Sequence, residues 1–351
     1  MAHSTAHTPP DAAPVSLCVR RHAKYLLRAL QVIPQIHESS VDANRMNVCF
    51  FGLSGLFVLP DEFNPVREQP GERARLVQWI KTLYVADTQA GWAGFHGGNT
   101  LRTAEQGVLH AGEHAGHVAM TYTALACLRL LDDPLTGLDR VALARGVAAL
   151  QLPDGSFLSS AQGGESDMRF TYCATAISHF IQDWTGVDRD RAVHFILQSI
   201  SYEGGIGQGP HLEAHGGSTY CGLAALQLMD RLDALGSVQR RKMIRWCVNR
   251  LNEGFNGRPN KLDDTCYTFW LGGALTILDP FPDIPNFIRQ VTPFVLETQD
   301  VITGGLSKSS DGSADILHTY LGLAGLSLAE FPGLNKVTPT LNIAQNRDHT
   351  S

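Results

Sequence analysis

The stretch Thr319-Tyr320-Leu321-Gly322-Leu323-Ala324-Gly325-Leu326 decides the fold, because variants of it recur along the chain. The first copy reads Cys49-Phe50-Phe51-Gly52-Leu53-Ser54-Gly55-Leu56. Between the two, four tyrosine pairs head similar apolar stretches, and the tyrosines recur at intervals of 47 to 53 residues: Thr121-Tyr122, Thr171-Tyr172, Thr219-Tyr220 and Cys266-Tyr267. Six copies of one unit indicate a repeat architecture.

Each unit predicts a pair of helices. The stretch after the tyrosine is apolar on most sides and rich in Ala and Gly, which is typical of a helix buried between neighbours. Its partner is amphipathic: from Ile244 to Leu251 apolar residues recur at i, i+3, i+4 and i+7 among cationic ones. No segment alternates apolar and polar residues as a strand would. We therefore expect an all-α fold of six helix pairs, either an open solenoid or a closed α–α barrel (toroid). No polar capping repeat is visible, which favours the barrel.

Length and composition bound the function. With 351 residues and 44% hydrophobic content the chain can bury a large core, and a net charge of −6 argues against nucleic-acid binding. The seven cysteines are odd in number and irregularly spaced, which indicates a reducing compartment, the cytoplasm. No apolar run reaches the roughly 18 residues of a transmembrane segment.

Three parts of the chain are expected. Residues 1–16 lack the apolar core of a secretory signal, and we interpret them as a disordered N-terminal arm. Residues 17–334 form the barrel. Residues 335–351 form a C-terminal tail of similar composition to the arm, in which Pro339 and Leu341 could dock locally.

The repeat is broken where Cys266 replaces the recurrent Thr, two residues after Asp264. His318 stands at the equivalent start of the next inner helix. Equivalent helix starts meet at one end of a barrel, so a carboxylate, a thiol and an imidazole could converge there. Three protein ligands with an open fourth position are the pattern of a catalytic zinc site. The alternative is that Cys266 is an ordinary buried thiol.

Positive charge gathers at the same predicted end. Arg258 and Lys261 precede Asp264, His215 precedes Thr219, and Arg169 begins another inner helix. Helix N-termini add free N–H groups and favour anions. As a group these residues fit a phosphate or diphosphate, although each alone could be a solvated loop charge. The aromatic residues of the inner helices could line an apolar cavity or form packed core.

The motifs resemble those of a known family, the β subunits of type I protein geranylgeranyltransferases, from about residue 20 to residue 341. The similar segments are Gly257-Arg258-Pro259-Asn260-Lys261 with Asp264-Thr265-Cys266-Tyr267, Asp167-Met168-Arg169-Phe170, Gly116-His117-Val118-Ala119-Met120 and Ser218-Thr219-Tyr220-Cys221-Gly222. The resemblance implies a barrel paired with a helical α subunit, which contributes an active-site lysine. It also implies transfer of geranylgeranyl from geranylgeranyl diphosphate to the cysteine of a C-terminal CaaX sequence, usually ending in Leu, on proteins such as small GTPases.

The resemblance also implies roles for individual residues. Asp264, Cys266 and His318 correspond to the ligands of one zinc ion, which would make the substrate cysteine a thiolate. The expected diphosphate contacts, which would stabilise charge on the leaving group, are His215, Arg258, Lys261 and Tyr267. The expected contacts to the CaaX peptide and the isoprenoid are Asn47, His117, Ala119, Met120, Arg169 and Phe170.

Two positions bear on which lipid is transferred. Farnesyl relatives carry an Asp after the last Gly-Gly-Leu-x, where it supports magnesium, but Lys308 stands here. We expect Lys308 to supply positive charge directly, so that magnesium is not required. Asn47 aligns where farnesyl enzymes carry a bulky aromatic and geranylgeranyl enzymes usually Thr; it departs from both but leaves room for a longer chain.

Other interpretations remain at this stage. A farnesyltransferase β subunit and a Rab-directed enzyme are close relatives of the expected activity. A terpene cyclase would need an Asp-x-Asp-Asp proton donor, which the chain lacks. A non-catalytic toroid acting as a binding module would have no use for the combined acid, thiol, imidazole and cations.

Overall fold

The computed structural model describes residues 16–31, 42–87, 89–98, 116–278 and 283–345. The predicted N-terminal arm therefore lies outside the described residues, apart from Ser16.

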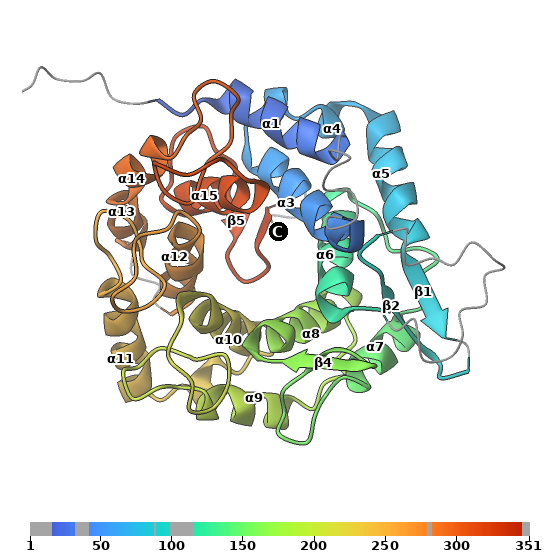
Figure 1. The fold of residues 1–351 in the computed structure, drawn as a ribbon. Coiled ribbons are helices and arrows are strands. Elements are labelled where there is room, and N and C mark those ends of the chain that lie inside the picture. The colour runs from blue at the N-terminus through green and yellow to red at the C-terminus, as the bar shows by residue number, and fades with distance from the viewer. Residues whose placement is uncertain (1–15, 32–41, 88, 99–115, 279–282, 346–351) are drawn as a thin grey trace, which may run out of the picture.

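Two concentric rings of helices make up the fold within the described ranges (Figure 1). The inner ring consists of α3 (Arg45–Val58), α6 (Val118–Leu130), α8 (Met168–Ile181), α10 (Gly216–Leu228), α12 (Tyr267–Leu278) and α15 (Ile316–Leu328). The outer ring consists of α1 (Val19–Gln31), α5 (Pro70–Thr82), α7 (Arg140–Ala148), α9 (Arg189–Gln198), α11 (Ser237–Val248) and the short pair α13 (Ile284–Arg289) and α14 (Thr292–Glu297). Each inner helix contacts the next, and α15 contacts α3. The ring is closed, which confirms the α–α barrel over the open solenoid.

Short elements connect the helices. They are α4 (Pro65–Glu68), the 3₁₀ turns η2 (Asp42–Asn44), η3 (Asp61–Phe63) and η5 (Leu232–Ala234), and the antiparallel pairs β1 (Tyr84–Asp87) with β2 (Trp92–Phe95), β3 (Leu158–Ser160) with β4 (Gly163–Ser166), and β5 (Val337–Thr338) with β6 (Ile343–Ala344). The sequence did not predict these strands, because two to four residues are too few to show an alternating pattern.

The recurrent threonine has a structural task that explains the repeat. The Thr219 hydroxyl accepts a hydrogen bond from the Ile206 N–H at 2.9 Å, and the Thr319 hydroxyl accepts one from the Leu306 N–H at 2.9 Å. Each bond ties the start of an inner helix to the loop that arrives from the outer ring. In the fifth repeat a backbone bond from Asp264 N–H to Phe255 O, at 3.0 Å, joins the same two segments. The repeats that keep the threonine have the equivalent backbone bond as well, for example from His215 N–H to Ile206 O at 3.0 Å, so this junction does not rest on the threonine hydroxyl alone.

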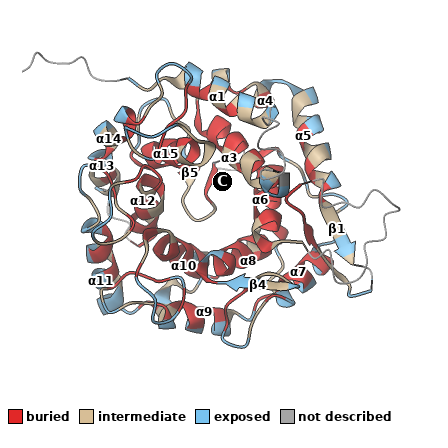
Figure 2. Cartoon of the chain, in the orientation of Figure 1, coloured by how far each residue is buried: buried red, intermediate tan, exposed pale blue. Residues whose placement is uncertain are grey.

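A buried histidine links the first outer helix to the last repeat. The Nδ1 atom of His22 accepts a hydrogen bond from Gly305 N–H at 2.9 Å, so Nε2 carries the proton and donates to Gln299 Oε1 at 3.0 Å. Burial lowers the pKa of His22 and keeps the ring neutral. Figure 2 shows the inner helices largely buried, with exposed residues on the outer faces of the outer helices. None of the helices in the described ranges is long and apolar enough to cross a membrane.

The C-terminal segment folds back into the ring, where Figure 1 shows β5 and the turn after it. Tyr220 donates its hydroxyl proton to Pro339 O at 2.7 Å, Tyr122 to Leu341 O at 3.0 Å, and Tyr320 to Asn342 O at 2.6 Å. Although its composition is similar to that of the N-terminal arm, the C-terminal tail is therefore ordered over residues 335–345. Their carbonyl groups find buried hydroxyl donors on three inner helices, and the docking expected at Pro339 and Leu341 is observed. Residues 346–351 lie outside the described residues.

Candidate active site

The structure brings Asp264, Cys266 and His318 together at the N-terminal ends of α12 and α15. One carboxylate oxygen, the thiol sulfur and one imidazole nitrogen all lie within 4.8 Å of one another. The His318 Nε2 atom lies 3.2 Å from Asp264 Oδ1, which also accepts the Cys266 N–H at 3.0 Å. Asp264 and Cys266 are buried and His318 is partly buried. The break in the repeat thus corresponds to a real cluster.

The pKa shifts of His318 and Cys266 indicate that a positive charge would stabilise the cluster. Burial alone would lower the pKa of His318, but hydrogen bonds to Asp264 and Asp315 outweigh it and raise that pKa to about 9. Burial, reinforced by the negative charge of Asp264, raises the pKa of the Cys266 thiol well above its usual range. A cation bound between these groups would remove both costs, because it favours the thiolate and the neutral imidazole.

This donor set fits zinc. Carboxylate, thiolate and imidazole are its usual protein ligands, at about 2.0 to 2.3 Å, and three such ligands leave one position open. Asp315 completes the arrangement, because its carboxylate bonds the Nδ1 atom of His318 and caps α15 by accepting His318 N–H at 2.9 Å. A carboxylate behind a liganding histidine fixes the ring orientation and tautomer. Asp315 was not predicted from the sequence, although an Asp three residues before His318 at a helix start matches the N-cap spacing.

Tyr267 and His215 form a donor pair beside the cluster. Nδ1 of His215 caps α10 by accepting Gly217 N–H at 3.1 Å, so Nε2 carries the proton and donates to the Tyr267 hydroxyl at 2.9 Å. Burial lowers the pKa of His215 and raises the pKa of Tyr267, so the imidazole is neutral and the phenol protonated. The Tyr267 proton is then free to donate to an anion. Gly257 makes this possible, because a Cβ atom there would overlap the Tyr267 ring and hydroxyl.

Arg258, Lys261 and Lys308 are the cations expected around this pair and the cluster. The Arg258 guanidinium pairs with Glu213 at 3.0 Å and remains partly exposed. Lys261 is exposed, and its amine has no hydrogen bond or ion pair among the described residues. The Lys308 amine lies 3.8 Å from Asp264 Oδ2, and its backbone is fixed because Thr265 N–H donates to Lys308 O at 3.0 Å. Arg258 and Lys308 thus have contacts beside the cluster, whereas no contact among the described residues places the Lys261 amine there. Glu213 is an additional carboxylate that was not predicted from the sequence.

Arg169 is placed differently from the other cations. Its guanidinium forms a paired hydrogen bond with Asp167 and a further one, at 2.7 Å, with Glu165. Asp167 also caps α8 by accepting Arg169 N–H at 2.8 Å. Two carboxylates therefore offset the charge of Arg169, which makes it a weaker anion contact than a free guanidinium.

An apolar cavity of about 290 Å³ opens beside these polar groups. Its lining includes three of the expected lipid and peptide contacts, Asn47, Ala119 and Arg169, together with His215. The lining residues absent from the expected set include Phe50, Phe51, Thr123, Tyr172, Cys173, Gln208, Trp270 and Asn342.

The other three expected contacts lie outside this lining. Met120 and Phe170 are buried, and the His117 ring meets Phe170 edge-on at 5.8 Å between centroids. The Nδ1 atom of His117 caps α6 by accepting Ala119 N–H at 3.1 Å.

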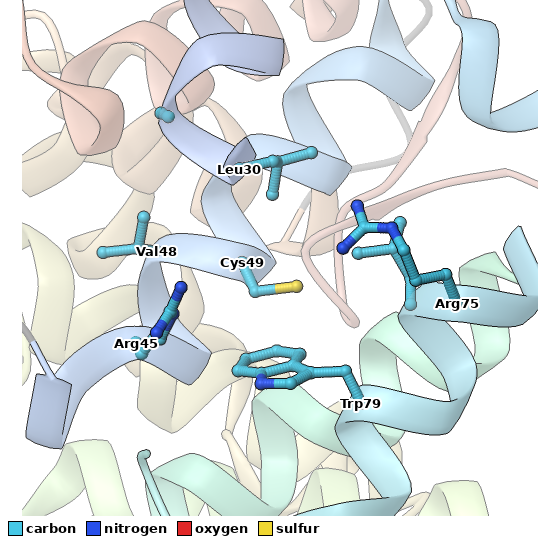
Figure 3. Close-up of a pocket in the computed structure, with 8 residues that line it drawn as sticks. Leu30, Arg45, Val48, Cys49, Arg75 and Trp79 are labelled. Atoms are coloured by element: carbon cyan, nitrogen blue, oxygen red, sulfur yellow. The ribbon is translucent and has the colours of Figure 1, made fainter. Parts of the chain in front are cut away.

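A second cavity of about 60 Å³ lies on the outer side of the ring, between α1, α3 and α5 (Figure 3). Leu30, Cys49 and Trp79 form part of its wall, and Arg45 and Arg75 flank it. The Arg75 guanidinium is held by Glu72 at 2.8 Å. No residue predicted to act in catalysis or binding lies in this cavity.

Comparison with known proteins now decides the family. A model of the prenyltransferase alpha-alpha toroid domain matches residues 17–343. This chain belongs to the prenyltransferase α–α toroid family. A geranylgeranyl transferase type-1 subunit beta from Dictyostelium discoideum is 32% identical, over 92% of this chain and 94% of the relative. One from Arabidopsis thaliana is 34% identical, over 92% of this chain and 88% of the relative.

A solved structure supports the same family membership. Candida albicans protein geranylgeranyltransferase-I complexed with GGPP superposes with a TM-score of 0.80 at 26% identity, over 94% of this chain and 96% of that chain. The expected family, toroid fold and prenyltransferase class are confirmed. The family model also extends past residue 334. It includes most of residues 335–345, the C-terminal hairpin formed by β5 and β6 inside the ring.

Proposed function

We propose that this chain is the catalytic β subunit of a type I protein geranylgeranyltransferase. It would transfer geranylgeranyl from geranylgeranyl diphosphate to the cysteine of a CaaX sequence, usually one ending in Leu. The observation that carries the proposal is the meeting of three elements at one end of the ring. These are the Asp264, Cys266 and His318 cluster, the cations around Tyr267, and the mouth of the apolar cavity.

The cluster would hold one zinc ion through Asp264, Cys266 and His318, with Asp315 orienting the imidazole. When bound, zinc would make the incoming cysteine a thiolate nucleophile. The thiolate sulfur forms a bond to C1 of the isoprenoid while the bond from C1 to the diphosphate oxygen breaks. The electron pair of the broken bond leaves with the diphosphate.

The leaving group would develop its charge beside Tyr267 and the cations. The free Tyr267 proton and the Arg258 guanidinium are donors that need no rearrangement of the helices, and the exposed Lys261 amine would add a third. Diphosphate would compete with Glu213 for Arg258, since both are anionic partners of one guanidinium. Lys308 lies close enough to Asp264 to add charge between the cluster and the diphosphate, which supports transfer without magnesium.

The cavity is proposed as the isoprenoid site. Its aromatic and apolar walls suit a hydrocarbon, for which burial contributes about 0.8 kcal/mol per CH₂ group. Asn47 and Ala119 would contact the lipid. His117, Met120, Arg169 and Phe170 would contact the CaaX peptide; of these, Arg169 lines the cavity and the other three lie outside its lining.

Partner and compartment follow from the same assignment. The family resemblance supports a heterodimer with a helical α subunit that supplies a further lysine. CaaX proteins such as small GTPases would be the protein substrates. All seven cysteines are free thiols, which supports the cytoplasm as the place of action.

A competition assay tests the proposed activity. The chain, purified with a matching α subunit, is given equal amounts of geranylgeranyl and farnesyl diphosphate and a CaaX peptide ending in Leu, with and without magnesium. Predominant geranylgeranyl product in both conditions is expected. Predominant farnesyl product would contradict the substrate assignment, and strict dependence on magnesium would contradict the role given to Lys308.

A further inference from the structure

The C-terminal hairpin is fixed at a defined depth inside the ring. Its Pro339, Leu341 and Asn342 carbonyls accept hydrogen bonds from the hydroxyls of Tyr220, Tyr122 and Tyr320 respectively. These tyrosines are buried and belong to three different inner helices, so the hairpin is held from several sides. They are also the residues that define the sequence repeat, which gives the recurrent Thr-Tyr pair a second structural task.

The hairpin enters from the end of the ring opposite the polar cluster. Asn335, at its base, donates to Phe57 O at 3.1 Å and Leu59 O at 2.8 Å, at the C-terminal end of α3. The cavity residues of the inner helices lie instead in the first two helical turns, as Asn47, Ala119 and Ser218 do. The lining of the cavity therefore includes Arg169 and His215, near the N-terminal ends of the inner helices, and Asn342 of the hairpin, which enters from the other end.

Asn342 is the residue of the described hairpin that lines this cavity. It is 3% exposed, and its Oδ1 atom lies 2.9 Å from the Tyr320 hydroxyl, whose single proton is shared between this oxygen and the Asn342 carbonyl. The Nδ2 amide is the remaining polar group of this side chain. A hydrocarbon tail that reached past the aromatic walls would have to cover this amide, and covering a polar group without a partner is unfavourable.

We propose that Asn342 forms the floor of the isoprenoid cavity and limits the length of the lipid that the enzyme transfers. The proposal rests on the proposed function, which assigns the cavity to the isoprenoid. The length limit would then come from a segment outside the helical repeats, attached through the tyrosine hydroxyls.

The backbone at Asn342 provides a clean test. Its φ of 52° lies in the left-handed region, which glycine adopts readily, so Asn342→Gly removes the side chain without straining the turn. The backbone carbonyl that Tyr320 binds remains. Gln182→Gly is the matched control, because Gln182 has a φ of 55° and is exposed at the end of α8, away from the cavity.

The assay compares kcat/KM for geranylgeranyl diphosphate and for the diphosphate longer by one isoprene unit, in the heterodimer. Asn342→Gly should raise the longer-to-shorter ratio by about tenfold or more, the scale on which hydrophobic pockets discriminate small size differences. Gln182→Gly should leave the ratio unchanged. Asn342→Ser, which retains a hydrogen-bonding group in a smaller side chain, should shift the ratio in the same direction.

The outcomes separate this inference from the proposed function. If the Asn342 variants transfer geranylgeranyl normally and the ratio does not change, Asn342 is not the floor and the inference is overturned. If the wild-type heterodimer transfers no geranylgeranyl at all, the proposed function fails instead.

Discussion

Replacing Tyr267 by Phe tests the proposed arrangement of donors around the leaving diphosphate. Nδ1 of His215 is occupied by Gly217 N–H, so Nε2 donates to Tyr267 and the phenol proton remains available for the diphosphate. The variant removes this one proton and leaves the ring in place against Gly257 and Gly216.

The expected loss is catalytic. Removing one preorganised donor from a site of developing negative charge costs about 2.7 to 4 kcal/mol of barrier, a fall of roughly 10² to 10³ in the rate of the chemical step. The cost to stability is smaller, about 1 kcal/mol for one partly buried hydrogen bond. The protein should therefore stay folded while the reaction slows.

Single-turnover transfer from preloaded geranylgeranyl diphosphate measures the step directly, and thermal unfolding reports the stability. Tyr84→Phe is the control, because it also removes one tyrosine hydroxyl, which accepts from Asp139 N–H at 3.2 Å on the outer side of the fold. A rate within about threefold of wild type for Tyr267→Phe would refute the assignment of Tyr267 as a donor to the leaving group.

Three further variants test the packing of Tyr267, the orientation of His318 and the buried His22. Gly257→Ala changes no donor, but its methyl group would displace Tyr267, so the transfer rate should fall as in Tyr267→Phe, whereas Gly71→Ala, which meets no atom within 4 Å, should transfer normally; equal rates would refute the steric argument. Asp315→Asn keeps an N-cap side chain but removes the carboxylate behind His318, and a chelator competition should show zinc held about 10 to 100-fold more weakly; unchanged retention would contradict the orienting role. The lowered pKa of His22 means that the unfolded chain takes up a proton below about pH 6.5 that the folded ring resists, so the free energy of unfolding falls as the pH drops. His22→Gln should lose that part of the pH dependence in unfolding measured at about pH 7.5 and 5.5, and an identical dependence would count against it.

The ring could be predicted because its cause is visible in the sequence. Thr219 and Thr319 recur with a glycine-led apolar residue upstream, and the structure joins each pair by a hydrogen bond. Because the same hydrogen-bonded residue types recur in each unit, they are visible as a period in the sequence. The number and type of helix pairs can be predicted from that period.

The C-terminal hairpin could not be predicted in the same way. Its attachment uses the carbonyl groups of Pro339, Leu341 and Asn342, and every residue carries a carbonyl. The tyrosine donors were identified as repeat residues. The carbonyl groups that accept their hydroxyl protons lie some twenty to two hundred residues away in the chain. The tail composition therefore suggested disorder.

The polar site was partly predictable. Cys266 stood out because it interrupts a repeated position, and His318 because it stands at the equivalent start of the next inner helix; the structure brings them together. Arg169 illustrates the limit: its position predicted an anion contact, yet Asp167 and Glu165 already engage its guanidinium. Which carboxylate meets which cation depends on the path of the loops, and that path is not encoded in the helical period.

The central claim is that Asp264, Cys266 and His318 hold the zinc ion on which transfer depends. Metal analysis of the purified heterodimer, combined with the transfer assay, tests it directly in wild type, in Cys266→Ala and in Cys247→Ala, a control at another buried free thiol. The account predicts about one zinc per wild-type heterodimer. It predicts the same content and activity in Cys247→Ala, and loss of both metal and transfer in a folded Cys266→Ala. Full transfer activity in Cys266→Ala without bound zinc would contradict it.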